Sequence, residues 1–174
     1  MSLTPKTVPT GAIRYNTDFN KMECFNGTKW MQIAVSSPDL NGGARGLNMG
    51  GAPAIDNIDY FTIPTAGNAV DFGNLATARY LNAGCSSSTR GLTAGGNIPE
   101  SNNIEFITIP STGNGTSFGN LTASKRNFAG GGNETRGIFV GGLEPGSSYQ
   151  TDIDYVTIAS TGNANDFGDL TVAR

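Results

Sequence analysis

The chain has 174 residues and a mass of 18.0 kDa, which is room for one domain, or one domain with a small appendage, and excludes a multidomain enzyme. It has no histidine, so a Ser-His-Asp triad, a Cys-His pair and the usual zinc sites are excluded. The net charge is −3 and no basic cluster larger than Lys125-Arg126 occurs, so nucleic acid is not an expected partner.

Residues 1–10 are predicted to be an extended N-terminal arm. The segment from Met1 to Lys6 lacks the apolar core of a signal peptide, and no apolar run reaches the roughly 18 residues of a membrane-spanning helix. We therefore expect a soluble, unprocessed chain with no membrane partner. Cys24 and Cys85 lack the spacing of metal ligands or of a redox pair, so we expect two unpaired thiols and no cofactor.

Residues 11–35 are predicted to form a three-stranded β-meander. Asn26-Gly27 is a strong hairpin signal, and the residues before it alternate between polar and apolar. Because so small a sheet is marginally stable alone, we expect the attachment-module aromatics Tyr15, Phe25 and Trp30 to bury against something larger. Residues 36–44 have the composition of a linker.

Three copies of one pattern follow, at residues 45–79, 90–125 and 136–174. Each copy contains an Arg-Gly pair, a Gly-Gly pair, an Ile-acid-aromatic run, a Gly-Asn turn and a Phe-Gly motif. Length varies mainly between the Gly-Gly pair and the Ile-acid run, which predicts a loop there. The structural positions of the repeat are the glycine pairs and the phenylalanines: Gly50, Gly51, Gly95, Gly96, Gly141, Gly142, Phe72, Phe118 and Phe167.

Four strands are predicted for a copy: a short one that ends at Gly-Gly, a longer one, one centred on the phenylalanine, and one in the linking stretches 80–84 and 127–131. The longer strand is apolar on both faces, which is typical of a sheet covered on each side by a neighbour. We expect positive φ in the turn after it, at Gly67, Gly113 and Gly162. The run Gly130-Gly131-Gly132, which overlaps the second linking stretch, lacks the Lys-Ser/Thr ending of a phosphate loop and is predicted to be a turn.

The segment from Gly137 to Gly142 resembles the double-glycine strand of the kelch-type β-propeller family. Tyr155 lies where that family has its next aromatic, Phe167 takes the place of its tryptophan, and Arg174, like Arg79, resembles the basic residue that closes the kelch unit. The resemblance covers about residues 40–174. It implies an all-β fold of three kelch-like four-stranded blades preceded by the small meander.

Three blades are fewer than the four to eight of a typical propeller, and phenylalanine replaces tryptophan in every copy. Repeat units bury their core only by stacking, so the end blades need a cover. Two chains in a six-bladed ring, three chains packed by their open faces, or a larger partner would provide one. The interpretation is a partial or oligomer-completed propeller, in a homo-oligomer that is a dimer or a trimer, or under a capping partner.

The N-terminal meander, from Pro9 to Trp30, resembles a module of virion structural proteins in tailed bacteriophages of marine cyanophage type, including tail fibres, head fibres and capsid decoration proteins. That resemblance implies a location in the virion and attachment to other virion proteins or to a sister chain. The leading hypothesis is a non-enzymatic fibre, knob or capsid-decoration subunit that docks by this module. The alternative is a receptor-binding module that recognises a host surface glycan or protein.

A third hypothesis is a small carboxylate-dependent glycosidase, opposed by the lack of any acid pair outside the repeat. The repeated acids, Asp59, Glu105 and Asp154, are predicted to cap backbone or turn groups instead of forming a metal or acid-base site. The repeated arginines, Arg45, Arg90 and Arg136, are predicted to hydrogen-bond loop carbonyls between blades instead of ringing a ligand. Sugar-stacking aromatics would be Tyr149, Trp30 and Tyr80, for which we expect buried anchoring. No catalytic or metal residue is assigned.

Overall fold

The computed structural model describes residues 8–18, 21–33 and 44–174. These residues hold sixteen strands, β1 to β16, and no helix, in several small antiparallel sheets, so the prediction of an all-β protein is confirmed. The chain divides into two units, Met1–Asp39 and Leu40–Arg174. The predicted arm (1–10) and linker (36–44) lie almost wholly outside the described residues.

The first unit is a three-stranded sheet in which β1 (Ile13–Asn16), β2 (Lys21–Phe25) and β3 (Trp30–Gln32) pair antiparallel in chain order. Its second turn follows from Asn26-Gly27. The Asn26 side-chain oxygen accepts hydrogen bonds from the backbone of Thr28 and Lys29, and Gly27 has a φ of 98°, which glycine adopts without cost.

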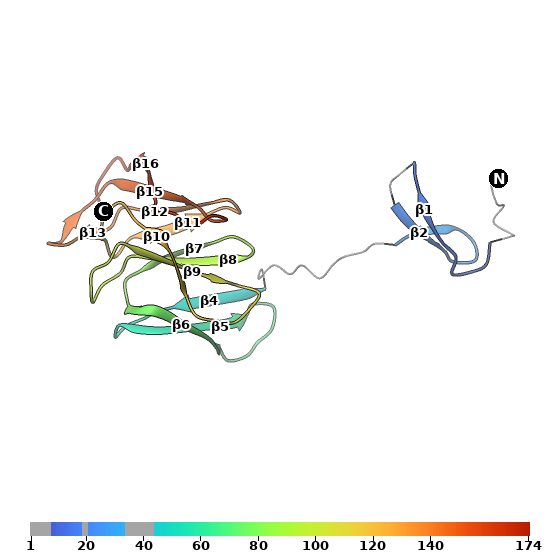
Figure 1. Ribbon diagram of the computed structural model, residues 1–174, viewed down its shortest axis with the longest axis horizontal. Coiled ribbons are helices and arrows are strands. Elements are labelled where there is room, and N and C mark those ends of the chain that lie inside the picture. Colours follow the sequence, from blue (N-terminus) through green and yellow to red (C-terminus); the bar gives the residue numbers. More distant parts are fainter. Residues whose placement is uncertain (1–7, 19–20, 34–43) are drawn as a thin grey trace. The chain divides into compact units, whose positions relative to one another are not determined.

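The second unit contains three successive sheets, one for each copy of the repeat, coloured from cyan to red in Figure 1. Sheet 1 is β4 (Arg45–Met49), β5 (Ile55–Thr62) and β6 (Val70–Arg79), which are three described strands instead of the four predicted for each copy. Sheet 2 is β7 (Ala83–Ser86), β8 (Arg90–Ala94), β9 (Asn103–Thr108) and β10 (Thr116–Asn120). Sheet 3 is β11 (Ala129–Gly132), β12 (Arg136–Val140), β15 (Asp152–Thr157) and β16 (Asn165–Asp169). The hairpin of β13 (Leu143–Glu144) and β14 (Ser148–Tyr149) follows β12.

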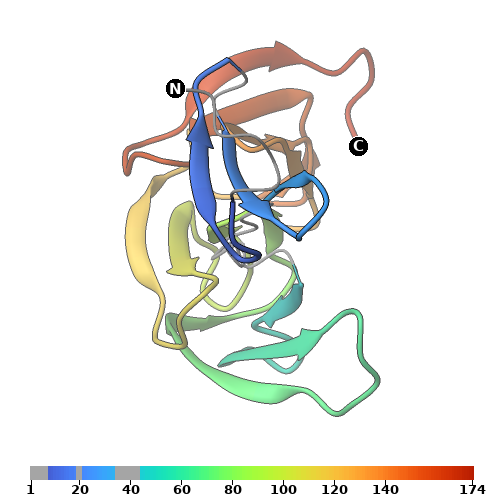
Figure 2. The ribbon, with the colours of Figure 1, turned by 90° about the vertical axis from the view of Figure 1, so that its right-hand side faces the viewer.

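Figure 2 shows the three sheets one after another along the second unit. Two apolar cores lie between consecutive sheets. The first joins sheet 1 to β9 and consists of Ile58, Phe72, Leu75 and Ile107. The second joins sheets 2 and 3 and is built around Leu92, Ile104, Phe118, Leu121, Phe139, Val156 and Ile158. Apolar residues on both faces of β9 are therefore buried, as its sequence predicts, because a neighbouring sheet covers each face.

The predicted turn chemistry is only partly correct. Gly113 alone of the three turn glycines has positive φ, at 157°, whereas Gly67 and Gly162 do not. Positive φ occurs instead just after each phenylalanine, at Gly73, Gly119 and Gly168. A β-bulge there breaks the register of the last strand of each sheet, β6, β10 or β16, which we call the outer strand.

The prediction of a turn at Gly130-Gly131-Gly132 is wrong, because these residues form β11. A side chain at Gly130 would collide with the backbone of Gly84 in β7. The glycine therefore permits β7 and β11, which are the first strands of sheets 2 and 3, to approach closely.

Candidate functional site

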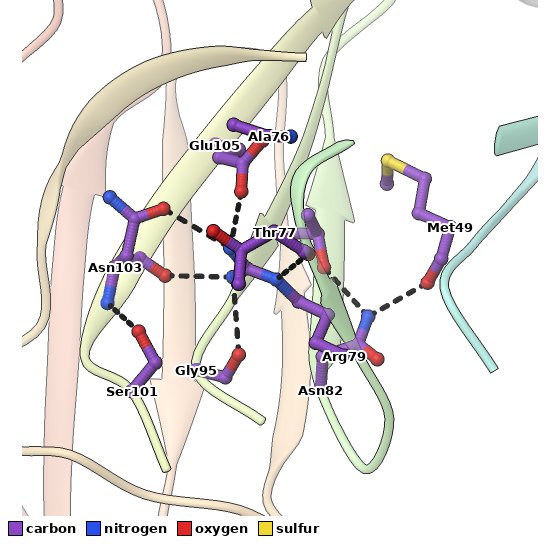
Figure 3. A network of polar contacts seen from close by, with 10 residues as sticks. Met49, Ala76, Thr77, Arg79, Asn82, Gly95, Ser101, Asn103 and Glu105 are labelled. Carbon is purple, nitrogen blue, oxygen red and sulfur yellow. Dashed lines mark hydrogen bonds and ion pairs between the residues drawn. The ribbon is translucent and has the colours of Figure 1, made fainter. Parts of the chain in front are cut away.

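A buried ion pair joins sheet 1 to sheet 2. Arg79, at the end of β6, pairs with Glu105 of β9, and both side chains are 2% exposed. The Arg79 guanidinium also donates to the Gly95 carbonyl and to the Asn103 carbonyl, each at 3.1 Å, and the Glu105 carboxylate accepts the Ala76 backbone N–H at 2.8 Å (Figure 3). Burial lowers the pKa of the Arg79 guanidinium, and the Glu105 carboxylate opposes this shift.

The same arrangement joins sheet 2 to sheet 3. Lys125 occupies the position of Arg79 and is fully enclosed, with its ammonium in ion pairs to Asp152 and Asp154 of β15. The Lys125 Nζ to Asp154 Oδ2 distance is 2.9 Å, and Asp154 Oδ1 accepts a hydrogen bond from the Thr122 hydroxyl at 2.6 Å. A basic residue of one sheet therefore reaches the acid of the next.

The predicted role of the repeated acids needs correction. Glu105 does accept a backbone N–H, but the main partner of both Glu105 and Asp154 is a buried basic side chain. A buried carboxylate requires a countercharge, and a cap by backbone groups does not supply one. The sequence carries a signal that we missed, because each copy holds one such acid and ends with one basic residue.

The glycine pairs fix the carbonyl of that same basic residue. The second glycine donates its N–H to it in every copy: Gly51 to Arg79, Gly96 to Lys125 and Gly142 to Arg174. The first glycine is left-handed, with φ of 74° at Gly50, 60° at Gly95 and 62° at Gly141, and a Cβ there would collide with the same carbonyl. The double glycine thus anchors the end of each sheet.

The repeated arginines behave as predicted in the first two copies. The guanidinium carbon lies 4.6 Å from the ring centre of Tyr60 for Arg45 and 4.6 Å from that of Phe106 for Arg90. Nη1 then donates to a carbonyl of the next sheet, from Arg45 to Ile109 at 2.6 Å and from Arg90 to Ile158 at 3.0 Å. Arg136 stacks on Tyr155 at 4.7 Å, and no hydrogen bond links its guanidinium to another described residue.

The phenylalanines lie at the β-bulges of the outer strands. The Phe72 carbonyl accepts the Gly113 N–H and the Phe118 carbonyl accepts the Gly162 N–H, each at 2.8 Å. In both cases the Gly-Asn turn of the next sheet forms the contact. Phe72 and Phe118 are each 3% exposed, whereas Phe167 is 53% exposed, because no described sheet follows it.

The attachment-module aromatics behave differently from one another in the first unit. Phe25 is 2% exposed and packs on Trp30 with ring centres 5.4 Å apart, while the Arg14 guanidinium lies 4.2 Å from the Trp30 ring. Tyr15 is 55% exposed, so its expected burial is not found within this unit.

One face of this small sheet is apolar and open. Register places Ile13, Tyr15, Met22 and Met31 on the face opposite Phe25 and Trp30, and their exposed fractions are 61%, 55%, 42% and 46%. Four large apolar side chains on so small a sheet are an exposed patch of the kind that marks interaction sites.

One further hollow and two tyrosines among the described residues bear on a possible binding site. A hollow of about 340 Å³ beside β4 is lined by Arg45, Leu47, Met49, Cys85 and Ile109 among others. The expected burial of Tyr149 is wrong, because this side chain on the β13–β14 hairpin is 62% exposed, whereas the Tyr80 hydroxyl accepts a hydrogen bond from Asn97. Both cysteines are free thiols, and the described residues contain no cluster of three or more His, Cys, Asp or Glu side chains that could hold a metal ion. No membrane-spanning helix was found among the described residues.

In comparisons with known proteins, no protein-family model and no curated protein matches this chain.

Proposed function

We propose that this chain is a non-enzymatic structural subunit, in which the three-stranded unit attaches to a larger assembly and the three-sheet unit is displayed. One observation carries the proposal. Wherever two sheets meet, the recurring charged side chains, which would be the candidates for a repeated active site, are occupied in the contact between the sheets: Arg45, Arg79, Arg90, Glu105, Lys125 and Asp154. A repeat that uses its charges in this way is built for stacking and not for turnover.

The proposed setting is the particle of a tailed bacteriophage, as a fibre, knob or capsid-decoration subunit. Support comes from the resemblance of the segment from Pro9 to Trp30 to attachment modules of virion proteins, and from the exposed apolar face of that unit. We further propose that the three sheets are kelch-like blades of an incomplete propeller. The double glycines, which anchor the end of each sheet, support that reading.

The experiment uses gradient-purified phage particles that lack the chain, to which the purified chain is added. We expect the chain to co-sediment with particles. The Ile13→Asp and Met31→Asp variants should bind at least about tenfold more weakly, because each places a charge without a partner in the exposed apolar face that binding would bury. Val70→Asp, at a 52% exposed position of the other unit, is the matched control and should bind normally. Equal binding by all variants, or none by the native chain, would rule the proposal out.

A receptor-binding role is the second candidate, favoured by the exposed Tyr149 on the β13–β14 hairpin. Exposed aromatic rings are suited to stacking on sugar faces. If the chain binds a host glycan array and Tyr149→Ala abolishes that binding, the result would support the receptor-binding role over a purely structural role. A blank array together with particle binding supports the structural role, and hydrolysis of chromogenic glycosides would contradict both.

A further inference from the structure

The contact between consecutive sheets occurs twice in this chain, and an unmatched half of it remains at each end of the three-sheet unit. We define the first face by Asp59, Phe61, Ile63, Gly67 and Asn68 of sheet 1. We define the last face by Arg136, Phe167, Gly168, Asp169 and Arg174 of sheet 3. Every residue of either face has equivalents in the other two copies, so the structure itself shows what each one contacts when a neighbour is present.

Burial separates these faces from their equivalents. Ile63 is 63% exposed, whereas the equivalent Ile109 and Ile158 are 4% and 1% exposed. Phe61 is 45% exposed, whereas Ile107 and Val156 at the same position are each 2% exposed. On the last face Phe167 is 53% exposed against 3% for its two equivalents. Each face is therefore an apolar surface of a kind that elsewhere in the chain is covered by a sheet.

The hydrogen-bonding groups on the two faces are complementary. Within the chain, the Gly-Asn turn of one sheet donates two backbone N–H groups to the outer strand of the preceding sheet: Gly113 to Phe72 and Gly115 to Asn74, then Gly162 to Phe118 and Ala164 to Asn120, all at 2.8 Å. The asparagine side chain returns the bond, since Asn114 accepts from the Asn74 N–H at 3.0 Å. The first face carries this turn as Gly67-Asn68-Ala69, and the last face carries the acceptors as Phe167 and Asp169.

The charges are complementary as well. Arg79 and Lys125 each reach the acid of the following sheet. Arg174 occupies the same position in the third copy, Asp59 is the acid of the first copy, and neither has an ion-pair partner within the described part of the chain. Arg136 stacks on its aromatic ring, as Arg45 and Arg90 do. Its guanidinium is therefore placed to donate to the Ile63 carbonyl of a second copy, in the way that those of Arg45 and Arg90 donate to Ile109 and Ile158 within the chain.

We infer that the last face of one copy binds the first face of a second copy, head to tail, by repeating the contact that joins sheets 1, 2 and 3. Arg174 pairs with Asp59, the Phe167 carbonyl accepts the Gly67 N–H, and Phe61 and Ile63 are buried beneath sheet 3. The rotation between successive sheets then decides whether the copies close into a ring or continue as a filament. This inference rests on the proposed function only in treating the three-sheet unit as a building block, and particle binding tests that function separately.

The test is the mass of the purified 174-residue chain by sedimentation velocity and native mass spectrometry over a range of concentrations. We expect masses that are multiples of the 18.0 kDa chain. A ring would give one discrete oligomer mass, and a filament would give a series that grows with concentration. A chain that remains at 18.0 kDa throughout would overturn the inference.

Two blocking variants distinguish a head-to-tail contact from a symmetric one. Ile63→Asp disables the first face and Phe167→Asp the last, and since both side chains are exposed, each variant should fold and remain monomeric. Mixed one to one, they should form a dimer and nothing larger, because one intact face of each kind is present. Self-association of either variant alone, or no dimer in the mixture, would refute the head-to-tail contact. Tyr149→Asp, on the hairpin outside both faces, is the control and should associate as the native chain does.

A milder variant tests the same contact without a charge. A Cβ at Gly168 has open space around it in the single chain, but at the equivalent Gly119 it would collide with the Gly162 carbonyl of the next sheet. Gly168→Ala should therefore weaken association at least about tenfold. Because alanine is also strained at the φ of 134° found there, an unchanged circular dichroism spectrum of the variant is the control that assigns the loss to the collision. Unchanged association would contradict the proposed alignment of the two faces.

Discussion

At the scale of single residues, the backbone two residues after Arg79 and two residues after Lys125 is left-handed. Leu81 and Asn127 occupy equivalent positions before β7 and β11, and both are left-handed, with φ of 60° and 55°. Asparagine tolerates this region, whereas leucine is strained there because its Cβ approaches the backbone. Leu81 is 39% exposed, so little packing compensates for the strain.

Replacing Leu81 with asparagine should therefore stabilise the protein by about 1 kcal/mol, because the strain of a left-handed leucine is removed. Urea unfolding measures the change. The reverse substitution at the equivalent position, Asn127→Leu, is the matched comparison and should destabilise by a similar amount. A loss of stability in Leu81→Asn would show that the exposed leucine contributes more by packing than its backbone costs.

The Cys85 thiol gives a second prediction at this scale. Burial raises its pKa to about 12 from 9.0, so between these values the unfolded chain loses the proton and the folded chain keeps it. The free energy of unfolding should consequently fall above pH 9, by up to about 1.4 kcal/mol per pH unit for this group. Subtracting the pH profile of Cys85→Ala isolates it from other titrating groups. A flat difference from pH 9 to 11 would contradict the prediction.

At the scale of elements, the main question is what a buried ion pair between two sheets contributes. Desolvation of both charges opposes the attraction of Arg79 for Glu105, so such a pair stabilises little relative to apolar side chains of similar size. Its orientation is specific, however, because the Arg79 guanidinium also binds the carbonyls of Gly95 and Asn103. We interpret the pair as a device that fixes the register between consecutive sheets.

Removing one partner should be costly. Glu105→Ala leaves the Arg79 charge buried without a countercharge, and we expect a loss of about 3 to 5 kcal/mol in the free energy of unfolding. The double variant Arg79→Met/Glu105→Leu should recover most of that loss. Glu23→Ala, in the exposed pair with Arg14, is the comparison and should change stability much less. Equal losses for the single and double variants would mean that the cost lies in packing and not in the uncompensated charge.

The strands could be predicted from the sequence because glycine, asparagine and apolar periodicity recur at fixed positions in three copies. The double-glycine strand and the strand at Phe72, Phe118 and Phe167 lie where the pattern places them. The repeat shows one acid and one closing basic residue in every copy, but it does not show that Arg79 pairs with Glu105 of the following copy, because that approach depends on how the sheets pack. The same holds for the positive φ at Gly73 and Gly119, which depends on a β-bulge and not on the turn residues.

At the scale of the whole molecule, stability is expected to be uneven along the chain. Repeat proteins gain stability from each interface between neighbouring units. Sheet 2 has two such interfaces, and sheets 1 and 3 have one each in the single chain. Of the described residues of the three-stranded unit, only Phe25 belongs to the buried apolar residues. A sheet of three short strands with so small a core is marginal by itself.

Hydrogen exchange of the full chain in its monomeric form, enforced by Phe167→Asp, tests this gradient. We expect the amides of β8 and β9 to be protected most, because both faces of sheet 2 are covered, those of β5 and β15 less, and those of β1 to β3 least. In the associated native chain, protection of β5 and β15 should rise towards that of β9, while β1 to β3 stay unchanged. Uniform protection across all three sheets of the monomer would show instead that the repeat unit opens only as a whole, and that its end sheets need no further neighbour for their stability.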